Sequence, residues 1–454
     1  MPTSSATPSS QSAATTASSI DLSKRDLTLD LARVFCVLLV VVIHLLFIGV
    51  GFSADGQLVI SRPLELQPWF AAATWFGQIM PLFFVVGGFA SITAWRSSVR
   101  RGGTAADYVK ARVLRLAQPT LPLFIFYVVV IGAATIIGID PALLGSVVMG
   151  AGSPLWFVAA YVLCQAFVPV MVRFHTRAAV PTLVVLLVGV IVVDAVQFST
   201  AIPVLGYFNM FFVWLLVQQI GFWYADGWFA RRRWWQLVLI PIVCYAALVP
   251  IVFLGPYDTN MLTNLNPPTL PLVLLALAQA CLLRLLRPAL AKLMSTRGAR
   301  AVVFLAGSRL MTIYLWHLPI IIMIAGVALL IPGASPEPAS PAWWWSRILV
   351  YLIVLAALFA LSFLVGRWEQ PRELGPTPPI VVVAVAAVLT FVPAFLVTVL
   401  FLQLWLAILG AGMFSVAILL LGRWPQRWGG SETVTARDAA TTPGRTPRPT
   451  AETR

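Results

Sequence analysis

The sequence predicts an all-α fold, a polytopic transmembrane bundle of about twelve spans. Of the 454 residues, 60% are hydrophobic and only 10% are charged, whereas a soluble domain has about 25% charged residues. The apolar residues also form uncharged runs of about 20, the length that a helix needs to cross a bilayer. Together these observations predict an integral membrane protein.

Ten apolar runs that can each hold one span precede residue 370. They lie near 29–51, 69–95, 116–138, 154–172, 179–199, 207–226, 234–254, 269–290, 302–331 and 343–366. A last uncharged block, 380–421, is far too long for one helix across a hydrocarbon core of about 30 Å. We divide this block around 402–405, which brings the predicted total to twelve.

The basic residues support this count. With the N-terminus in the cytoplasm, all 30 Lys and Arg residues except Arg62 and Arg347 fall on the cytoplasmic side. Such a bias is typical of cytoplasmic loops. We therefore expect a multi-pass protein of the cytoplasmic membrane with both termini inside. The net charge of +14 reflects this bias and predicts no nucleic-acid partner.

Both ends of the chain differ from the apolar region. Residues 1–24 are rich in Ser, Thr and Ala, and residues 431–454 are polar with several Pro and Thr, compositions typical of disordered tails. A secretory signal is not expected, because no basic segment is followed by an apolar one at the start. The four cysteines lie in apolar runs without a Cys-x-x-Cys pair, and the three histidines are far apart, so no metal site is predicted.

The first span carries the polar groups around which we expect the function to be organised. Arg33 and His44 are eleven residues apart, about 20° past three helical turns and roughly 16 Å along the axis. Asp30 falls on nearly the same face. Ionisable groups at membrane depth usually face an interior or a cavity and mark function. The alternative is a packing stripe with an arginine that extends to the surface, which suits Arg33 better than the deeper His44.

The loop after the second span is the most basic segment. Lys110, Arg112 and Arg115 surround the start of the third span, and the two arginines are one turn apart, so they can bind phosphate oxygens together. Cytoplasmic charge bias or attraction to anionic lipid headgroups is the alternative. Because this loop faces the inner end of the first span, a polyanionic ligand held there would reach toward His44.

Further polar residues interrupt the later spans. His317 lies between Tyr314 and Pro319, and it is either functional or helps to satisfy the carbonyl that the proline leaves free. His175 stands between two arginines in a short inner loop and is expected at the membrane interface. Asp194 is expected to pair with a neighbouring helix.

Five short segments, taken in order, form a recognisable set. They are Arg33-x10-His44, the Pro81–Phe89 segment PLFFVVGGF, Arg112–Val–Leu–Arg115, Leu155–Trp156–Phe157 with Tyr314–Leu–Trp–His317, and Glu369–Gln–Pro371. In this order and spacing they resemble the acyltransferase-3 family of integral membrane acyltransferases. The resemblance covers 25–372 and implies a ten-span acyltransferase-like domain, followed in 373–430 by two additional transmembrane helices.

The resemblance also implies a reaction. An acyl group, most often acetyl, would pass from acyl-CoA in the cytoplasm to a hydroxyl of a cell-envelope carbohydrate, a glycolipid or a related acceptor. The expected co-substrate is therefore acetyl-CoA, the expected reaction O-acetylation, and the expected partners are the hydroxyl acceptor and membrane lipids, with no metal. An imidazole titrates near neutral pH, so His44, which resembles the essential histidine of the family, would take the hydroxyl proton as a general base.

The remaining site residues follow from the same resemblance. Arg33 would orient the thioester or stabilise developing charge, and Arg112, Arg115 and Lys110 would hold the CoA phosphates. Asp30, Trp156, Tyr314 and His317 are further candidates. An acyl-His44 intermediate is the alternative to direct transfer.

A multi-span transporter of a lipid, a sugar or an acyl donor is the alternative function. Transporters commonly contain internal repeats with interrupted helices at matching positions. The sequence shows no such halves, and the basic loop together with the deep His44 favours an enzyme.

Overall fold

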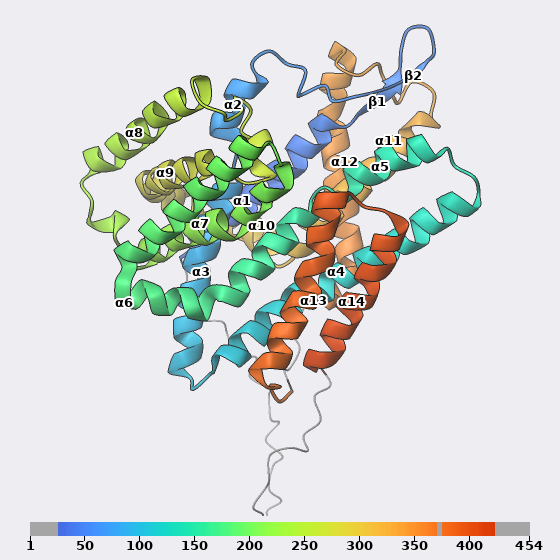
Figure 1. The fold of residues 1–454 in the computed structure, drawn as a ribbon. Helices are drawn as coiled ribbons and strands as arrows, with labels where there is room; N and C mark the ends of the chain where they lie inside the picture. Colours follow the sequence, from blue (N-terminus) through green and yellow to red (C-terminus); the bar gives the residue numbers. More distant parts are fainter. Residues whose placement is uncertain (1–25, 370–374, 423–454) are drawn as a thin grey trace, which may run out of the picture.

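The computed structural model describes residues 26–369 and 375–422, which form a bundle of helices (Figure 1). Eleven helices in the described residues are long and apolar enough to cross a membrane. The prediction of an all-α, polytopic bundle is therefore confirmed. The tails predicted for 1–24 and 431–454, and Pro371 of the last family segment, lie outside the described residues.

The elements follow one another with short connections. In order they are α1 (Leu27–Phe47), β1 (Gly49–Phe52), β2 (Leu58–Ser61), α2 (Phe70–Gly77), α3 (Met80–Arg100), α4 (Ala105–Ile136), α5 (Pro141–Gly152), α6 (Leu155–Thr200), η2 (Pro203–Phe208), α7 (Asn209–Ala225), η3 (Phe229–Arg231), α8 (Trp234–Phe253), η4 (Thr263–Leu265), α9 (Leu270–Met294), α10 (Arg297–Gly307), α11 (Leu310–Leu329), α12 (Pro341–Val365), η5 (Gly366–Trp368), α13 (Ile380–Leu400) and α14 (Leu404–Gly422).

Local sequence explains where several helices begin. Asp26 accepts a hydrogen bond from Thr28 N at the start of α1, and Thr104 and Asp107 form a capping box at the start of α4. These side chains satisfy amide groups that have no partner within the helix.

The helix α6 is too long to be a single straight membrane span. At 46 residues it would measure about 69 Å if straight, more than twice the hydrocarbon thickness. Ala178 departs from helical geometry and divides α6 into two arms, 155–177 and 179–200, which match the predicted fourth and fifth spans. Counting the arms separately would give the predicted twelve spans; the number that cross a membrane stays a prediction.

Other boundaries differ from the prediction. The expected span at 302–331 is two helices, α10 and α11, because the helix ends at Gly307 and restarts at Leu310. The expected span at 69–95 is likewise divided between α2 and α3 at Gln78 and Ile79. The hairpin β1–β2, in which Gly49 pairs with Ser61, was not predicted.

The arrangement places α1 between other helices of the bundle. α1 packs against α3, α9 and α11, and α3 in turn packs along α7. A Cβ atom added to Gly221 of α7 would come within 2.2 Å of Val85 O on α3, so glycine is required for this close approach. α13 and α14 lie side by side and pack on α4 and α6 (Figure 1).

The bundle has two distinct ends. We call the end that contains the start of α1, the α3–α4 turn and the C-terminus of α7 the basic end; the α3–α4 turn lies at the lower left of Figure 1. Arg287 on α9 reaches Asp26 there, and Arg96 on α3 reaches Asp226 after α7. The opposite end, which carries β1 and β2, is called the hairpin end.

Candidate active site

The helix α1 confirms the predicted alignment of its polar residues. It is continuous from Leu27 to Phe47, so Asp30, Arg33 and His44 follow one face from the basic end toward the hairpin end. Arg33 is partly buried, and its Nε atom is buried without a hydrogen-bond partner in the described part of the chain. His44 occupies the last turn of the helix, roughly 16 Å from the level of Arg33.

A second histidine lies against His44, which the sequence did not predict. His317 Nε2 is 3.3 Å from His44 Nδ1, and the ring centroids are 4.9 Å apart. His317 comes from α11 and is completely buried, whereas His44 is partly accessible. The structure therefore pairs two imidazoles from helices far apart in the chain.

Hydrogen bonds to the backbone assign the tautomers of this histidine pair. His317 Nδ1 lies against Tyr314 O, so this nitrogen carries the proton and Nε2 keeps its lone pair. His44 Nδ1 is 2.9 Å from Val40 O and must also be the protonated nitrogen, a donor toward Val40 O and His317 Nε2. Both hydrogen bonds of His44 among the described residues use Nδ1, so neither of them uses the lone pair on His44 Nε2.

His317 does not contact the backbone carbonyl that Pro319 leaves without a hydrogen-bond donor. The carbonyl that Pro319 leaves without an amide partner is that of Leu315, four residues earlier. His317 contacts Tyr314 O instead, so its proton is not used to satisfy the proline kink.

Aromatic residues from two predicted segments meet beside the pair. Tyr314 donates its hydroxyl to Pro154 O, 3.1 Å away, and its ring lies 4.4 Å from that of Phe157. Trp156 is buried and stacks on Trp214 at 5.5 Å. The Leu155–Phe157 and Tyr314–His317 segments thus lie side by side, and Trp156 is part of an aromatic stack.

Three arginines gather near the basic end. Arg115 on α4 interacts electrostatically with Arg33 on α1 and with Arg112 one turn away; Glu369 is the acidic group close to it. Arg115 is exposed and Arg112 is partly exposed, with its guanidinium 5.1 Å from the centre of the Tyr108 ring. Three guanidinium groups against one carboxylate leave this cluster positive, an arrangement that binds anions.

Lys110 does not extend into this cluster. It is buried, and its ammonium group donates to Gly375 O at 2.6 Å and Pro376 O at 2.9 Å. In this structure Lys110 ties α4 to the segment that precedes α13.

Glu369 has a structural role that sequence reasoning did not identify. Its carboxylate accepts hydrogen bonds from Met311 N at 2.9 Å, Thr312 N at 3.2 Å and the Thr312 hydroxyl at 2.7 Å. A carboxylate at a helix N-terminus satisfies free amides and complements the helix dipole. Glu369 therefore holds the start of α11, the helix that carries His317.

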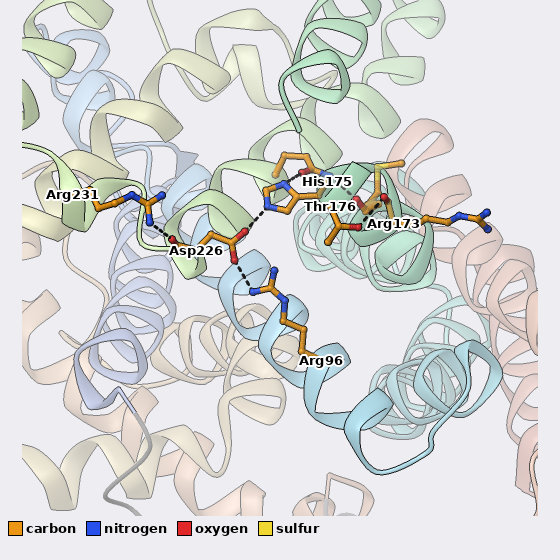
Figure 2. A network of polar contacts seen from close by, with 8 residues as sticks. Arg96, Arg173, His175, Thr176, Asp226 and Arg231 are labelled. Atoms are coloured by element: carbon orange, nitrogen blue, oxygen red, sulfur yellow. Dashed lines mark hydrogen bonds and ion pairs between the residues drawn. The ribbon is translucent and has the colours of Figure 1, made fainter. Parts of the chain in front are cut away.

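His175 is buried, which differs from the interfacial position expected for it. Figure 2 shows His175 beside Asp226, which also contacts Arg96 and Arg231. The His175 ring joins Gln219 Oε1 at 3.0 Å to Asp226 Oδ2 at 2.9 Å, and Arg96 donates to Asp226 Oδ1 at 2.6 Å. This network locks α3, α6 and α7 together at the basic end.

Asp194 pairs with neighbouring elements, as predicted. It is buried and accepts hydrogen bonds from Asn209 Nδ2, the Tyr257 hydroxyl and Leu270 N. Among the described residues, no group of three His, Cys, Asp or Glu side chains could hold a metal ion.

A family model of an acyltransferase domain, that of the acyltransferase-3 family, matches residues 26–367. This range contains α1 to α12 and leaves α13 and α14 outside. A search of curated proteins and a search of solved structures found no match.

Proposed function

Because this chain belongs to the acyltransferase-3 family, we propose that it transfers an acyl group, expected to be acetyl, from cytoplasmic acyl-CoA to an acceptor hydroxyl. The family of the chain and its long apolar helices together identify it as a multi-pass membrane acyltransferase. The acceptor that we propose is a carbohydrate or glycolipid of the cell envelope, modified by O-acetylation. The basic end faces the cytoplasm in this proposal, with both termini on that side.

The observation that carries the proposal is that two different sites lie along the single helix α1. The arginine cluster near the basic end suits a polyanion, and the His44–His317 pair lies roughly 16 Å further along the same helix. A donor with phosphates at one end and a thioester on a long arm fits this separation. A hydroxyl acceptor would approach His44 from the hairpin end.

We assign Arg33 to the donor phosphates rather than to the reacting carbonyl. Side chains of a helix point toward its N-terminus, so the guanidinium of Arg33 extends toward the basic end and away from His44. Its electrostatic interaction with Arg115 is consistent with this assignment. Arg33, Arg112 and Arg115 would then bind the donor together.

The proposed chemistry starts at the free lone pair of His44. Nε2 takes the acceptor's hydroxyl proton while the oxygen attacks the thioester carbonyl carbon. The C–S bond then breaks, and the leaving CoA thiolate receives the proton back from the His44 imidazolium, which gives an ester and free CoA. His317 accepts a hydrogen bond from His44 Nδ1–H throughout, so it favours the tautomer in which Nε2 is the base.

Replacement of His44 tests the proposal. His44→Asn should reduce acetyl transfer by at least about 100-fold, the usual contribution of general base catalysis, while the protein remains folded in the membrane. Incorporation of labelled acetyl groups from acetyl-CoA into envelope glycans and lipids is the measurement. Phe35→Leu is the matched control, because Phe35 lies on the exposed face of the same helix.

Two results would contradict the proposal. Full acetyl transfer by a folded His44→Asn protein would exclude His44 as the base. Movement of intact acetyl-CoA into vesicles, without acyl incorporation, would favour the transporter instead.

A further inference from the structure

We propose that the basic end contains a second anion site, separate from the arginine cluster on α1 and α4, that binds the headgroup phosphate of an anionic phospholipid. The site is a pocket of about 280 Å³ between α1, α3, α7, η3 and α9. Its lining includes Asp26, Phe89, Tyr224, Phe229, Arg284 and Arg287. None of Arg33, Arg112 and Arg115 lines it.

The charges of the pocket favour an anion. Arg287 donates to Asp26 Oδ2 at 3.2 Å, so one cation is paired with the one carboxylate of the lining. Arg284 makes no hydrogen bond or ion pair within residues 26–369 and 375–422 and is only partly exposed. Two guanidinium groups against one carboxylate therefore give the lining a net positive charge that a phosphate would neutralise.

A buried hydroxyl supplies an independent indication of a ligand. Tyr224 Oη is buried and has no hydrogen-bond partner in the part of the chain that the structure describes. The phenol interacts electrostatically with Arg284 and Arg287, which places it beside both guanidinium groups. Because buried polar groups in native structures are nearly always hydrogen-bonded, a phosphate oxygen accepting this proton would satisfy the hydroxyl.

The remaining walls indicate a lipid rather than a free ion. Phe89 and Phe229 flank Tyr224, with ring centroids 6.1 Å and 5.4 Å from it. The pocket lies where α1 starts and α7 ends, which in the proposed orientation is the depth at which headgroups would meet hydrocarbon. Basic pockets between transmembrane helices at this depth bind anionic headgroups, and the aromatic wall would contact the glycerol and the first acyl carbons.

The polar network of Figure 2 supports one wall of the pocket. Its central residue, Asp226, follows Tyr224 by two residues. Asp226 is bound by Arg96 and His175 through its carboxylate, and Arg231 donates to its carbonyl at 2.8 Å. These contacts fix the turn that joins the end of α7, where Tyr224 lies, to η3, which begins at Phe229. The site is therefore preorganised and does not need the lipid to assemble it.

Thermal unfolding of the whole protein in neutral detergent tests this inference. Phosphatidylglycerol should raise the Tm of the unmodified protein by about 3 °C or more, whereas phosphatidylcholine should not. Arg284→Gln and Tyr224→Phe should each lose most of this rise; the second variant keeps the packing of the ring and removes only the hydroxyl. Arg177→Gln, which removes an exposed arginine at the same end, should keep it.

Each other outcome would overturn the proposal. An equal rise in Arg284→Gln and Tyr224→Phe would mean that the lipid acts elsewhere. Inorganic phosphate that stabilises as well as phosphatidylglycerol would exclude the lipid as the source of the phosphate. Stabilisation by CoA that Arg284→Gln abolishes, without an effect of phosphatidylglycerol, would assign the pocket to the donor. Loss of acetyl transfer by His44→Asn is a separate measurement, so the two proposals can fail independently.

Discussion

The hydrogen bonds of Glu369 allow a sharp test of how α11 is held. Glu369→Gln keeps the shape of the side chain, but it removes the negative charge that faces three donors at the first turn of the helix. We expect lower stability and slower acyl transfer. Both effects would come from a displacement of α11, because this helix carries His317, which contacts His44.

The expected loss of folding stability in Glu369→Gln follows from these contacts. Loss of a charge at a helix N-terminus costs about 0.3–1 kcal/mol, up to about 2 when partly buried. Hydrogen bonds to a charged group, worth about 1.5–3 kcal/mol, would become neutral ones worth about 0.5–1.5 kcal/mol. Since these contributions overlap, we expect a loss of about 2–3 kcal/mol, or about 3 °C in Tm for a chain of this length.

The assay combines Tm with steady-state kinetics. A misplacement of about 1 Å can cost up to about 100-fold in rate, so kcat should fall by about 10- to 100-fold. The KM for acetyl-CoA should not rise, because the removed charge is negative and lies close to Arg115. Glu337→Gln, on an exposed loop at the hairpin end, is the control and should behave like the unmodified protein.

Two results would contradict this role of Glu369. A Glu369→Gln protein with unchanged Tm and kcat would show that the contacts of this carboxylate do not hold α11. A raised KM for acetyl-CoA with unchanged kcat would instead assign Glu369 to the donor.

Three further predictions concern the donor cluster, a helix contact and the basic end. Arg115→Gln should raise the KM for acetyl-CoA about 10-fold with little change in kcat, and unchanged donor kinetics would remove Arg115 from the phosphate site. Gly221→Ala should lower the Tm by about 1–3 °C, because the added Cβ would collide with a carbonyl of α3; a Tm equal to that of the unmodified protein would contradict this close approach. Partial burial acts to raise the pKa of Asp226, but hydrogen bonds from Arg96 and His175 outweigh it and lower that pKa. The ionised carboxylate therefore stabilises the folded protein above about pH 4 and stops doing so as the pH falls below its lowered pKa, so the Tm difference from Asp226→Asn should shrink between pH 6 and pH 3; a constant difference would refute the role of the charge.

Long apolar runs and a helical period made much of the fold predictable. The alignment of Arg33 with His44 required only a continuous helix, which α1 provides. The break between α10 and α11 was not visible, because the amides at the start of α11 are satisfied by Glu369, which follows Met311 by 58 residues. The hairpin β1–β2 was missed for a similar reason, since Phe52 N bonds to Ser335 O in a distant loop.

The candidate site shows the same limit. The order of the family segments indicated which residues to consider, and a period of 3.6 could align those on one helix. No local pattern could place His317 against His44, because 273 residues separate them. The carbonyl partners of Lys110 belong to a segment beyond 372, so its burial was also outside the reach of spacing arguments.

The packing of α13 and α14 has a consequence for how the protein is made. Phe124 on α4 rests against Gly410 on α14, with room for no Cβ there, so α4 packs against a helix that is synthesised much later. Before α13 and α14 are inserted, the surface of α4 that they later occupy has no helix against it. Lys110 likewise waits for carbonyls that are synthesised about 265 residues after it. The packing around α4 is therefore complete only once α13 and α14 have been made, and a chain that stops before α13 would leave one side of α4 without its partner.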